Sequence, residues 1–287
     1  MSMNFTRRFM VTAVMLGGLV LASTVPAEAQ REFEPLFDKF NFKSELSMVG
    51  LKTSVGLFDE ELDMGATLNF EDDLNLGNRE TIPSFDFEWQ ISKRHRLAGR
   101  WQALNRGSNA QALTDIEWGD ETIPINADIT LIFDLSQFYI DYTYYPWVKE
   151  SWALGFGIGL RWMDLSTSLA WNLEGDEIIE GCQNADVTAP LPYLYFEYRR
   201  LLTENWRMIL GLGWLDVTIG DISGGQWIGR AGFEYLIGKR WSVGGAFNVA
   251  TVDVSADNIE DDDGFGTLSL KIDMDIWDLS LFGRVRF

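Results

Sequence analysis

Apolar and polar residues alternate almost without a break along the last twenty residues of the chain. Every second position there is apolar: Leu268, Leu270, Ile272, Met274 and Ile276, followed by Leu279, Leu281, Val285 and Phe287. Alternation with a period of two predicts a β-strand with two different faces. The apolar series changes phase around Trp277 and Asp278, which indicates a β-bulge. We therefore expect one continuous apolar face on this strand.

The strand is far longer than the five or six residues that are usual in globular proteins, and the chain stops on Phe287. A long alternating strand that ends on an aromatic residue resembles the closing strand of bacterial outer-membrane β-barrels. In that family the terminal aromatic residue belongs to the signal that the barrel-insertion machinery reads. The resemblance implies this role for Phe287 and a location in the bacterial outer membrane.

Nine further segments alternate in the same way, so the predicted fold is all-β, a closed antiparallel transmembrane β-barrel of about ten strands. The expected strands are 44–57, 82–92, 95–117, 127–146, 151–172, 189–201, 205–219, 225–237, 240–256 and 265–287. Short turns alternate with longer polar links, as in outer-membrane barrels, where the short turns are periplasmic. Residues 63–76 are interpreted as an extracellular extension of the first hairpin, since a further crossing would make the count odd. Eight to twelve strands remain possible.

The first 29 residues have a different character from the rest. Arg7 and Arg8 precede an apolar run, and Ala27-Glu28-Ala29 fits a signal-peptide cleavage site. The run is shorter than the ~20 apolar residues that a spanning helix needs. We therefore predict a signal peptide at 1–29, a periplasmic lead-in at 30–43 and the outer-membrane barrel at 44–287.

Within each predicted strand the charged residues share one face and the apolar residues, such as Phe85 and Leu210, share the other. An Arg or Lys on the lipid side costs roughly 2–4 kcal/mol near the midplane, so the charged face is predicted to line the lumen. The predicted lumen charge network consists of Asp86, Glu88, Arg100, Asp141, Arg161, Glu197, Arg199, Arg207, Arg230, Glu234, Arg284 and Arg286.

Tryptophans gather near the ends of the predicted strands. Trp89, Trp147, Trp152, Trp206 and Trp241 lie beside the short turns, and Trp118, Trp171, Trp214 and Trp227 lie nearer the long links. This distribution is typical of two aromatic girdles at the membrane surfaces. A soluble barrel would place its tryptophans in mid-strand.

The lumen network has two interpretations. The charges fill a narrow interior as interstrand salt bridges, or they line a selective ion path. We favour the first, because a barrel of about eight strands has room for little more than side chains. Lumen-facing Gly155, Gly157, Gly159, Gly211 and Gly213 either leave space or admit a large side chain from the opposite wall.

The candidate chemistry is sparse. Enzymes among small outer-membrane barrels generally use a histidine paired with a carboxylate or a serine. The single histidine, His95, follows Lys93 and Arg94 in a short turn without an acid, and is predicted to be a solvated turn residue. The single Cys182 excludes an intrachain disulfide. We expect neither a metal nor a cofactor.

The predicted function is therefore a non-catalytic structural or surface protein, or a narrow pore. A small-solute or ion channel of the porin kind is the alternative, and a lipid- or peptide-modifying enzyme is a third possibility. The expected partners are outer-membrane lipid, lipopolysaccharide and the insertion machinery. The net charge of −20 argues against nucleic acid. Acidic loop segments such as 71–73 and 260–263 are solvated, or alternatively bind divalent cations.

Overall fold

The computed structural model describes residues 36–59, 64–73, 77–111, 116–118, 121–173, 179–219, 222–260 and 267–287. The predicted signal peptide, 1–29, lies outside the described residues. No helix in the described part of the chain is long and apolar enough to cross a membrane.

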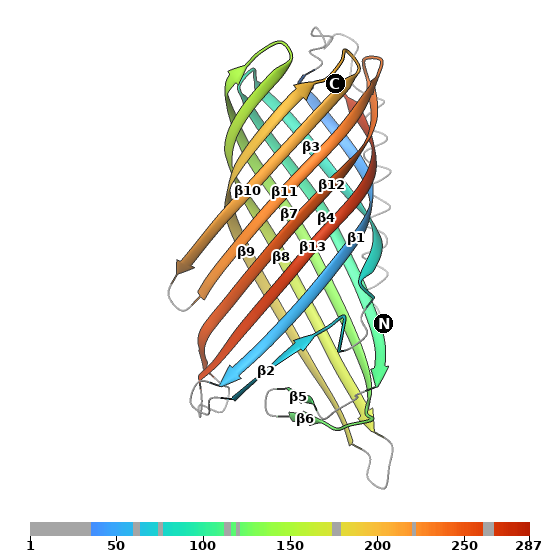
Figure 1. Ribbon diagram of the computed structural model, residues 1–287, viewed down its shortest axis with the longest axis vertical. Coiled ribbons are helices and arrows are strands. Elements are labelled where there is room, and N and C mark those ends of the chain that lie inside the picture. Colours follow the sequence, from blue (N-terminus) through green and yellow to red (C-terminus); the bar gives the residue numbers. More distant parts are fainter. Residues whose placement is uncertain are drawn as a thin grey trace.

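Ten long antiparallel strands form the barrel (Figure 1). They are β1 (Phe40–Asp59), β3 (Arg79–Ser92), β4 (His95–Gln111), β7 (Asp128–Val148), β8 (Trp152–Leu173), β9 (Ile179–Leu201), β10 (Trp206–Ile219), β11 (Ile222–Ile237), β12 (Trp241–Glu260) and β13 (Thr267–Arg286). Each strand pairs with the next, and β13 pairs with β1, so the sheet closes on itself. The predicted closed ten-stranded fold is confirmed.

Three short strands complete the described part. β2 (Met64–Asn69) pairs with the far end of β1, and β5 (Ile116–Trp118) pairs with β6 (Glu121–Ile123). Residues 64–69 thus extend the first hairpin, as expected, and do not add a crossing. Because β1 begins at Phe40, the barrel takes in the last residues of the predicted lead-in. The end with the short turns and the C-terminus, at the top of Figure 1, is called the periplasmic end below.

The inner face of the wall changes its chemistry between the periplasmic half and the far half of the barrel. In β13 the inward residues are Ile272, Met274, Ile276, Asp278, Ser280, Phe282, Arg284 and Arg286, all of them buried. The register of β13 against β1 and β12 shows no shift at Trp277 or Asp278. The predicted bulge and the continuous apolar outer face are therefore wrong. The phase of β13 stays constant, and its inner face changes from apolar to charged toward the C-terminus. The side chains of residues 268 and 270 are not among those described.

The same change occurs around the barrel. In β1 the inward Lys43 and Glu45 give way to Val49 and Leu51, and in β7 the inward Gln137 follows a run of apolar residues. The inward apolar residues of the far half form one core, named here the apolar cluster. It contains Val49, Leu51, Val55, Phe70, Ile82, Leu104, Ala127, Ile129, Leu131, Phe133, Leu135, Met163, Leu165, Trp171, Val252, Ile272, Met274 and Ile276.

The outer face shows the opposite change. Near the periplasmic end it is apolar, with residues such as Leu281 and Leu210 exposed, whereas Asp275 and Lys271 face outward farther along β13. One exposed tryptophan ring surrounds the short-turn end, with Trp89, Trp147, Trp206 and Trp241. A second, with Trp162, Trp214 and Trp227, marks the far edge of the apolar band.

Trp171 is a correction to the predicted far girdle, because it is buried inside the apolar cluster; the side chain of Trp118 lies outside the description. In β10 the band runs from Trp206 to Trp214, close to the about 9–11 residues that cross a bilayer. The strands continue beyond it, so the far half of the barrel stands outside the membrane. There the outer face meets water, and the interior is built like that of a soluble protein.

This arrangement predicts opposite effects for two adjacent residues of β13. Met274→Ala removes an inward side chain from the apolar cluster and should lower the free energy of unfolding by about 2–5 kcal/mol. Asp275→Ala, on the exposed outer face, should change it by no more than about 0.5 kcal/mol. Denaturant unfolding in lipid vesicles measures both. Equal effects of the two substitutions would show that Met274 and Asp275 do not lie on opposite faces of β13.

Candidate functional site: the barrel interior

The residues just before β1 enter the periplasmic mouth of the barrel. Leu36 and Phe37 are buried against Tyr145 and Ala153, and the rings of Phe37 and Tyr145 meet edge to face at 4.9 Å. These residues act as a plug, named here the N-terminal plug (residues 36–38). The sequence analysis placed them in a periplasmic lead-in and missed this contact, because so short a segment shows no alternation.

Asp38 fastens the plug to the wall. Its carboxylate lies 2.9 Å from Arg207 Nη2, 2.6 Å from Arg286 Nη2 and 3.7 Å from Arg284 Nη1. Arg207 and Arg284 also reach Glu234, at 2.9 and 3.3 Å. Burial alone would raise the pKa of Asp38, but the three guanidinium groups outweigh burial and lower the pKa from 3.8 to about 2.

A second layer of charge lies beside the plug. Arg199 bridges two carboxylates, with Nη2 3.0 Å from Glu88 and Nε 2.6 Å from Glu197. Arg96 reaches the same two groups, at 3.3 and 2.6 Å. Tyr145 donates a further hydrogen bond to Glu197. The two arginines and two glutamates therefore neutralise one another inside the wall.

A third layer spans β1, β3 and β4. Arg100 lies 3.0 Å from both Glu45 and Asp86. Lys43 is 2.6 Å from Asp86 and also pairs with Glu45, while Arg230 approaches Asp86 at 3.6 Å. The prediction omitted Lys43 and Glu45, although the inward positions of 41–47 already alternate as polar residues.

Most of the predicted network is thus brought together. Asp86, Glu88, Arg100, Glu197, Arg199, Arg207, Arg230, Glu234, Arg284 and Arg286 form ion pairs within 4.0 Å. Two predicted members differ. Asp141 accepts a hydrogen bond from Tyr193, and Arg161 donates to Gln137 at 2.9 Å with its guanidinium 5.3 Å from the Tyr139 ring centroid.

The inward glycines make room for tyrosines of the neighbouring strand. A Cβ at Gly159 or Gly213 would lie 2.2 or 3.1 Å from the Tyr193 ring, and one at Gly211 would lie 2.6 Å from Tyr195 Oη. The tyrosines of β9 therefore lie flat against the wall over glycines of β8 and β10. These glycines therefore do not leave empty space. They admit large side chains, which come from the adjacent strand and not from the opposite wall as expected.

The other candidate residues lie outside this interior. His95 begins β4, and its Nδ1 lies 2.5 Å from Tyr142 Oη beside the ring of Tyr144. It is half-buried between tyrosines and not freely solvated, so that expectation is corrected. The side chain of Cys182 is not among those described. In the described part of the chain, no three His, Cys, Asp or Glu side chains are placed to hold a metal ion.

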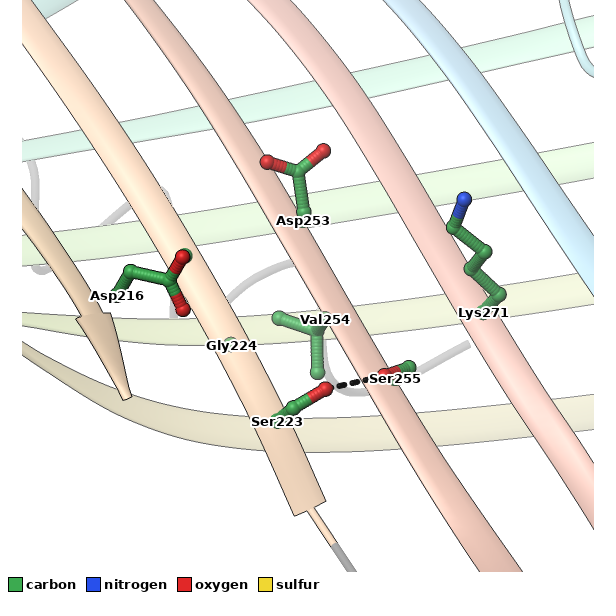
Figure 2. A pocket seen from close by; sticks show the side chains of 8 residues that line it. Asp216, Ser223, Gly224, Asp253, Val254, Ser255 and Lys271 are labelled. Carbon is green, nitrogen blue, oxygen red and sulfur yellow. Dashed lines mark hydrogen bonds between the residues drawn. The ribbon is translucent and has the colours of Figure 1, made fainter. Parts of the chain in front are cut away.

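A shallow pocket lies on the outer wall beyond the far tryptophan ring (Figure 2). Asp216, Asp253 and Lys271 line it, and Ser223 and Ser255 hydrogen-bond at 2.5 Å across β11 and β12. These groups face solvent and belong to the polar outer surface of the half that stands outside the bilayer.

A closed antiparallel sheet with an apolar outer band between tryptophan rings, short turns at one end and a charged interior defines a transmembrane β-barrel of the bacterial outer-membrane kind. The chain matches no family model and no curated protein.

Three solved structures of similar fold are distant in sequence. The toluene transporter TodX of P. putida is 9% identical, with 88% of this chain and 91% of that chain covered and a TM-score of 0.36. OprG of Pseudomonas aeruginosa is 13% identical (88% and 98% covered, TM-score 0.34). Neisserial surface protein A is 10% identical (87% and 97% covered, TM-score 0.32). At these identities the likeness concerns the fold alone.

Asp38→Asn should loosen the N-terminal plug. Removing one partner of a buried ionic cluster costs about 3–5 kcal/mol, because the remaining charges stay buried without compensation. Hydrogen exchange of the backbone amides around residue 40 should accelerate, and stability in lipid should fall. Lys39→Gln, at an exposed neighbouring position, is the matched control and should leave both unchanged. Equal behaviour of the two variants would mean that Asp38 does not anchor the plug.

The plug should also respond to pH in one direction. Because the pKa of Asp38 is lowered on folding, its contribution is fully present above 3.8 and is lost as the pH falls through about 2. Protection of the residue 40 amide should therefore stay constant above pH 3.8 and disappear on strong acidification. Loss of protection at a pH well above 3.8 would contradict this assignment.

Proposed function

We propose that the protein is a non-catalytic structural protein of the bacterial cell surface whose axial path is closed. The observation that carries this proposal is the filling of the interior in both halves of the barrel. Near the periplasm the N-terminal plug and three layers of paired charge occupy the interior. Farther out the apolar cluster occupies it.

These two barriers oppose ions for different reasons. The charges of the plug and of the three layers already have charged partners within 4.0 Å, so an ion that binds one of them would have to displace that partner. In the far half an ion would lose its water among apolar side chains, and the largely buried charges described there, Arg106 and Glu71, already pair with each other at 2.9 Å. A porin-like ion channel would need a wet path through the cluster, and for this reason it ranks second.

Export and partners follow from the same proposal. The signal peptide at 1–29 would deliver the chain across the inner membrane. Phe287 would serve as the insertion signal. It is exposed, and its backbone pairs with Phe40, with N–O distances of 2.8 and 3.2 Å. Lipid would contact the apolar outer band. Lipopolysaccharide would contact the polar wall outside the bilayer, where divalent cations at the acidic segments would be an additional link.

A catalytic role would require another arrangement around His95. Its described partners are the phenols Tyr142 and Tyr144, which supply neither an orienting carboxylate nor a nucleophilic serine. Hydrolysis of lipids or peptides that is lost on His95→Ala would contradict the non-catalytic proposal.

Reconstitution in planar bilayers tests the closed axis. The purified protein should show no steady single-channel conductance in a bilayer where a general porin conducts. A variant with Leu36, Phe37 and Asp38 all replaced by Gly should also stay closed, because the apolar cluster is untouched. Conductance of the unmodified protein would favour the channel instead. Conductance of the glycine variant alone would make the N-terminal plug the sole barrier.

A further inference from the structure

The wall of the barrel is incompletely paired at two places in the described structure. β3 pairs with β4 only from Ser92–His95 to Ser84–Gln102, and the second place lies between β9 and β10. β9 pairs with β8 along nearly its whole length, from Ile179 to Arg200. It pairs with β10 over a shorter stretch, which begins at the pair Leu201 and Arg207 and ends at the pair Leu194 and Trp214. Beyond that point residues 215–219 of β10 pair with β11 alone. In Figure 1 the tip of β10 stands apart from the far ends of β8 and β9. We call the unpaired edges, residues 188–193 and 215–219, the seam.

Two prolines explain why the pairing stops. Leu202 donates its N–H to Trp206 beside β10, and Leu201 donates to Ser151 beside β8, each at 2.8 Å. Since alternate residues of an antiparallel strand turn to opposite neighbours, the even-numbered residues of β9 face β10. The next even residues beyond Leu194 are Pro192 and Pro190, which have no N–H to donate.

One side chain bridges the seam from inside. Gln226 of β11 donates to the carbonyl oxygens of Leu191 and Pro192 at 3.0 and 3.2 Å. The bond to Pro192 replaces one that β10 does not provide, whereas the carbonyl of Leu191, an odd-numbered residue, faces β8. Its own Oε1 is buried without a partner in the described structure. Gln226 is therefore a polar latch at an edge where the backbone ladder is missing.

Behind the latch lies the apolar cluster. Ala189, Leu191 and Val254 pack against it from β9 and β12. Leu191 extends past β10 to β11, where its Cδ2 would be 3.8 Å from a Cβ at Gly224. The inner side of the seam is therefore apolar apart from the amide of Gln226.

The outer side of the seam begins at the far edge of the lipid-facing surface. The last β9–β10 pair, Leu194 and Trp214, is 55% and 57% exposed on the outer face. The seam begins directly beyond this pair, at the level of the far tryptophan ring. Only this end of the seam borders the outer leaflet, because Thr188 and Asp216 farther along it are exposed on the polar outer surface.

We propose that the seam is a lateral opening through which small uncharged apolar molecules pass between the outer leaflet and the apolar cluster. Gln226 and Leu191 rotate away to admit them, and no backbone hydrogen bond to β10 has to break. An ion is rejected by the apolar interior. The inference goes beyond the proposed function, since a barrel closed along its axis is still open to its side.

Photolabelling in lipid vesicles tests this opening. A diazirine-bearing alkylbenzene is added to the membrane, activated by light, and its sites of attachment are mapped by mass spectrometry. The unmodified protein should be labelled at inward Val254 as well as at outward Leu212. Gln226→Leu removes both latch bonds and should raise labelling of Val254 relative to Leu212 about tenfold.

A reversible lock provides the decisive comparison. In a Cys182→Ser background, Leu191→Cys with Gly224→Cys joins β9 to β11 on oxidation. Labelling of Val254 should then be lost and return on reduction, while Leu212 stays labelled. The matched control, Ser223→Cys with Ser255→Cys, joins β11 to β12 on the outer face, where pairing is already continuous (Figure 2). It should have no effect.

Two results would overturn the proposal: no label at Val254 in the unmodified protein, or label that persists when the 191–224 lock is oxidised. Neither result bears on conductance, so failure of the lateral opening and failure of the closed axis are distinguishable. Recovery on reduction shows that the locked protein is folded, which separates loss of access from misfolding.

Discussion

The structure depends on a change of solvent half way along every strand. A row of outward side chains meets lipid near the periplasmic end and water beyond the far tryptophan ring. Since both solvents select by polarity, the same row must be apolar in one half and polar in the other, and the inner row must do the reverse. β13 shows this directly: Leu281 and Lys271 share the outer face, and Arg284 and Met274 share the inner one.

The two halves therefore solve the problem of filling a narrow barrel in different ways. The far half has water outside and packs an apolar core, as any soluble domain does. The near half has lipid outside, so its polar groups must turn inward, where they are costly unless paired. Each inner carboxylate of the plug and the three charge layers accordingly contacts at least two cations, and Asp38 enters from outside the sheet to balance Arg207, Arg284 and Arg286.

The number and order of the barrel strands were predictable from sequence, because alternation and the lengths of the links depend only on local residues. The direction of each face was not. Alternation shows that a strand has two faces, but it does not show which face meets lipid. The exchange of apolar and polar residues between the two faces at Trp277 therefore looked like a bulge. Most of the ionic network was predictable for the near half, where the lipid rule holds. Asp38 was not, because its place depends on arginines about 170 and 250 residues away in the chain.

Closing a sheet into a barrel normally removes every free strand edge. Pro190 and Pro192 restore one, at the two positions where β9 would donate to β10, and both could be read in the sequence as alternate residues of a predicted strand. Stability alone does not explain this choice, since residues with an N–H would extend the ladder. The buried Gln226 donates to two carbonyl groups, and its own oxygen has no partner among the described residues. A wall that opens to the side requires a place where few bonds must break, and the β9–β10 edge is such a place.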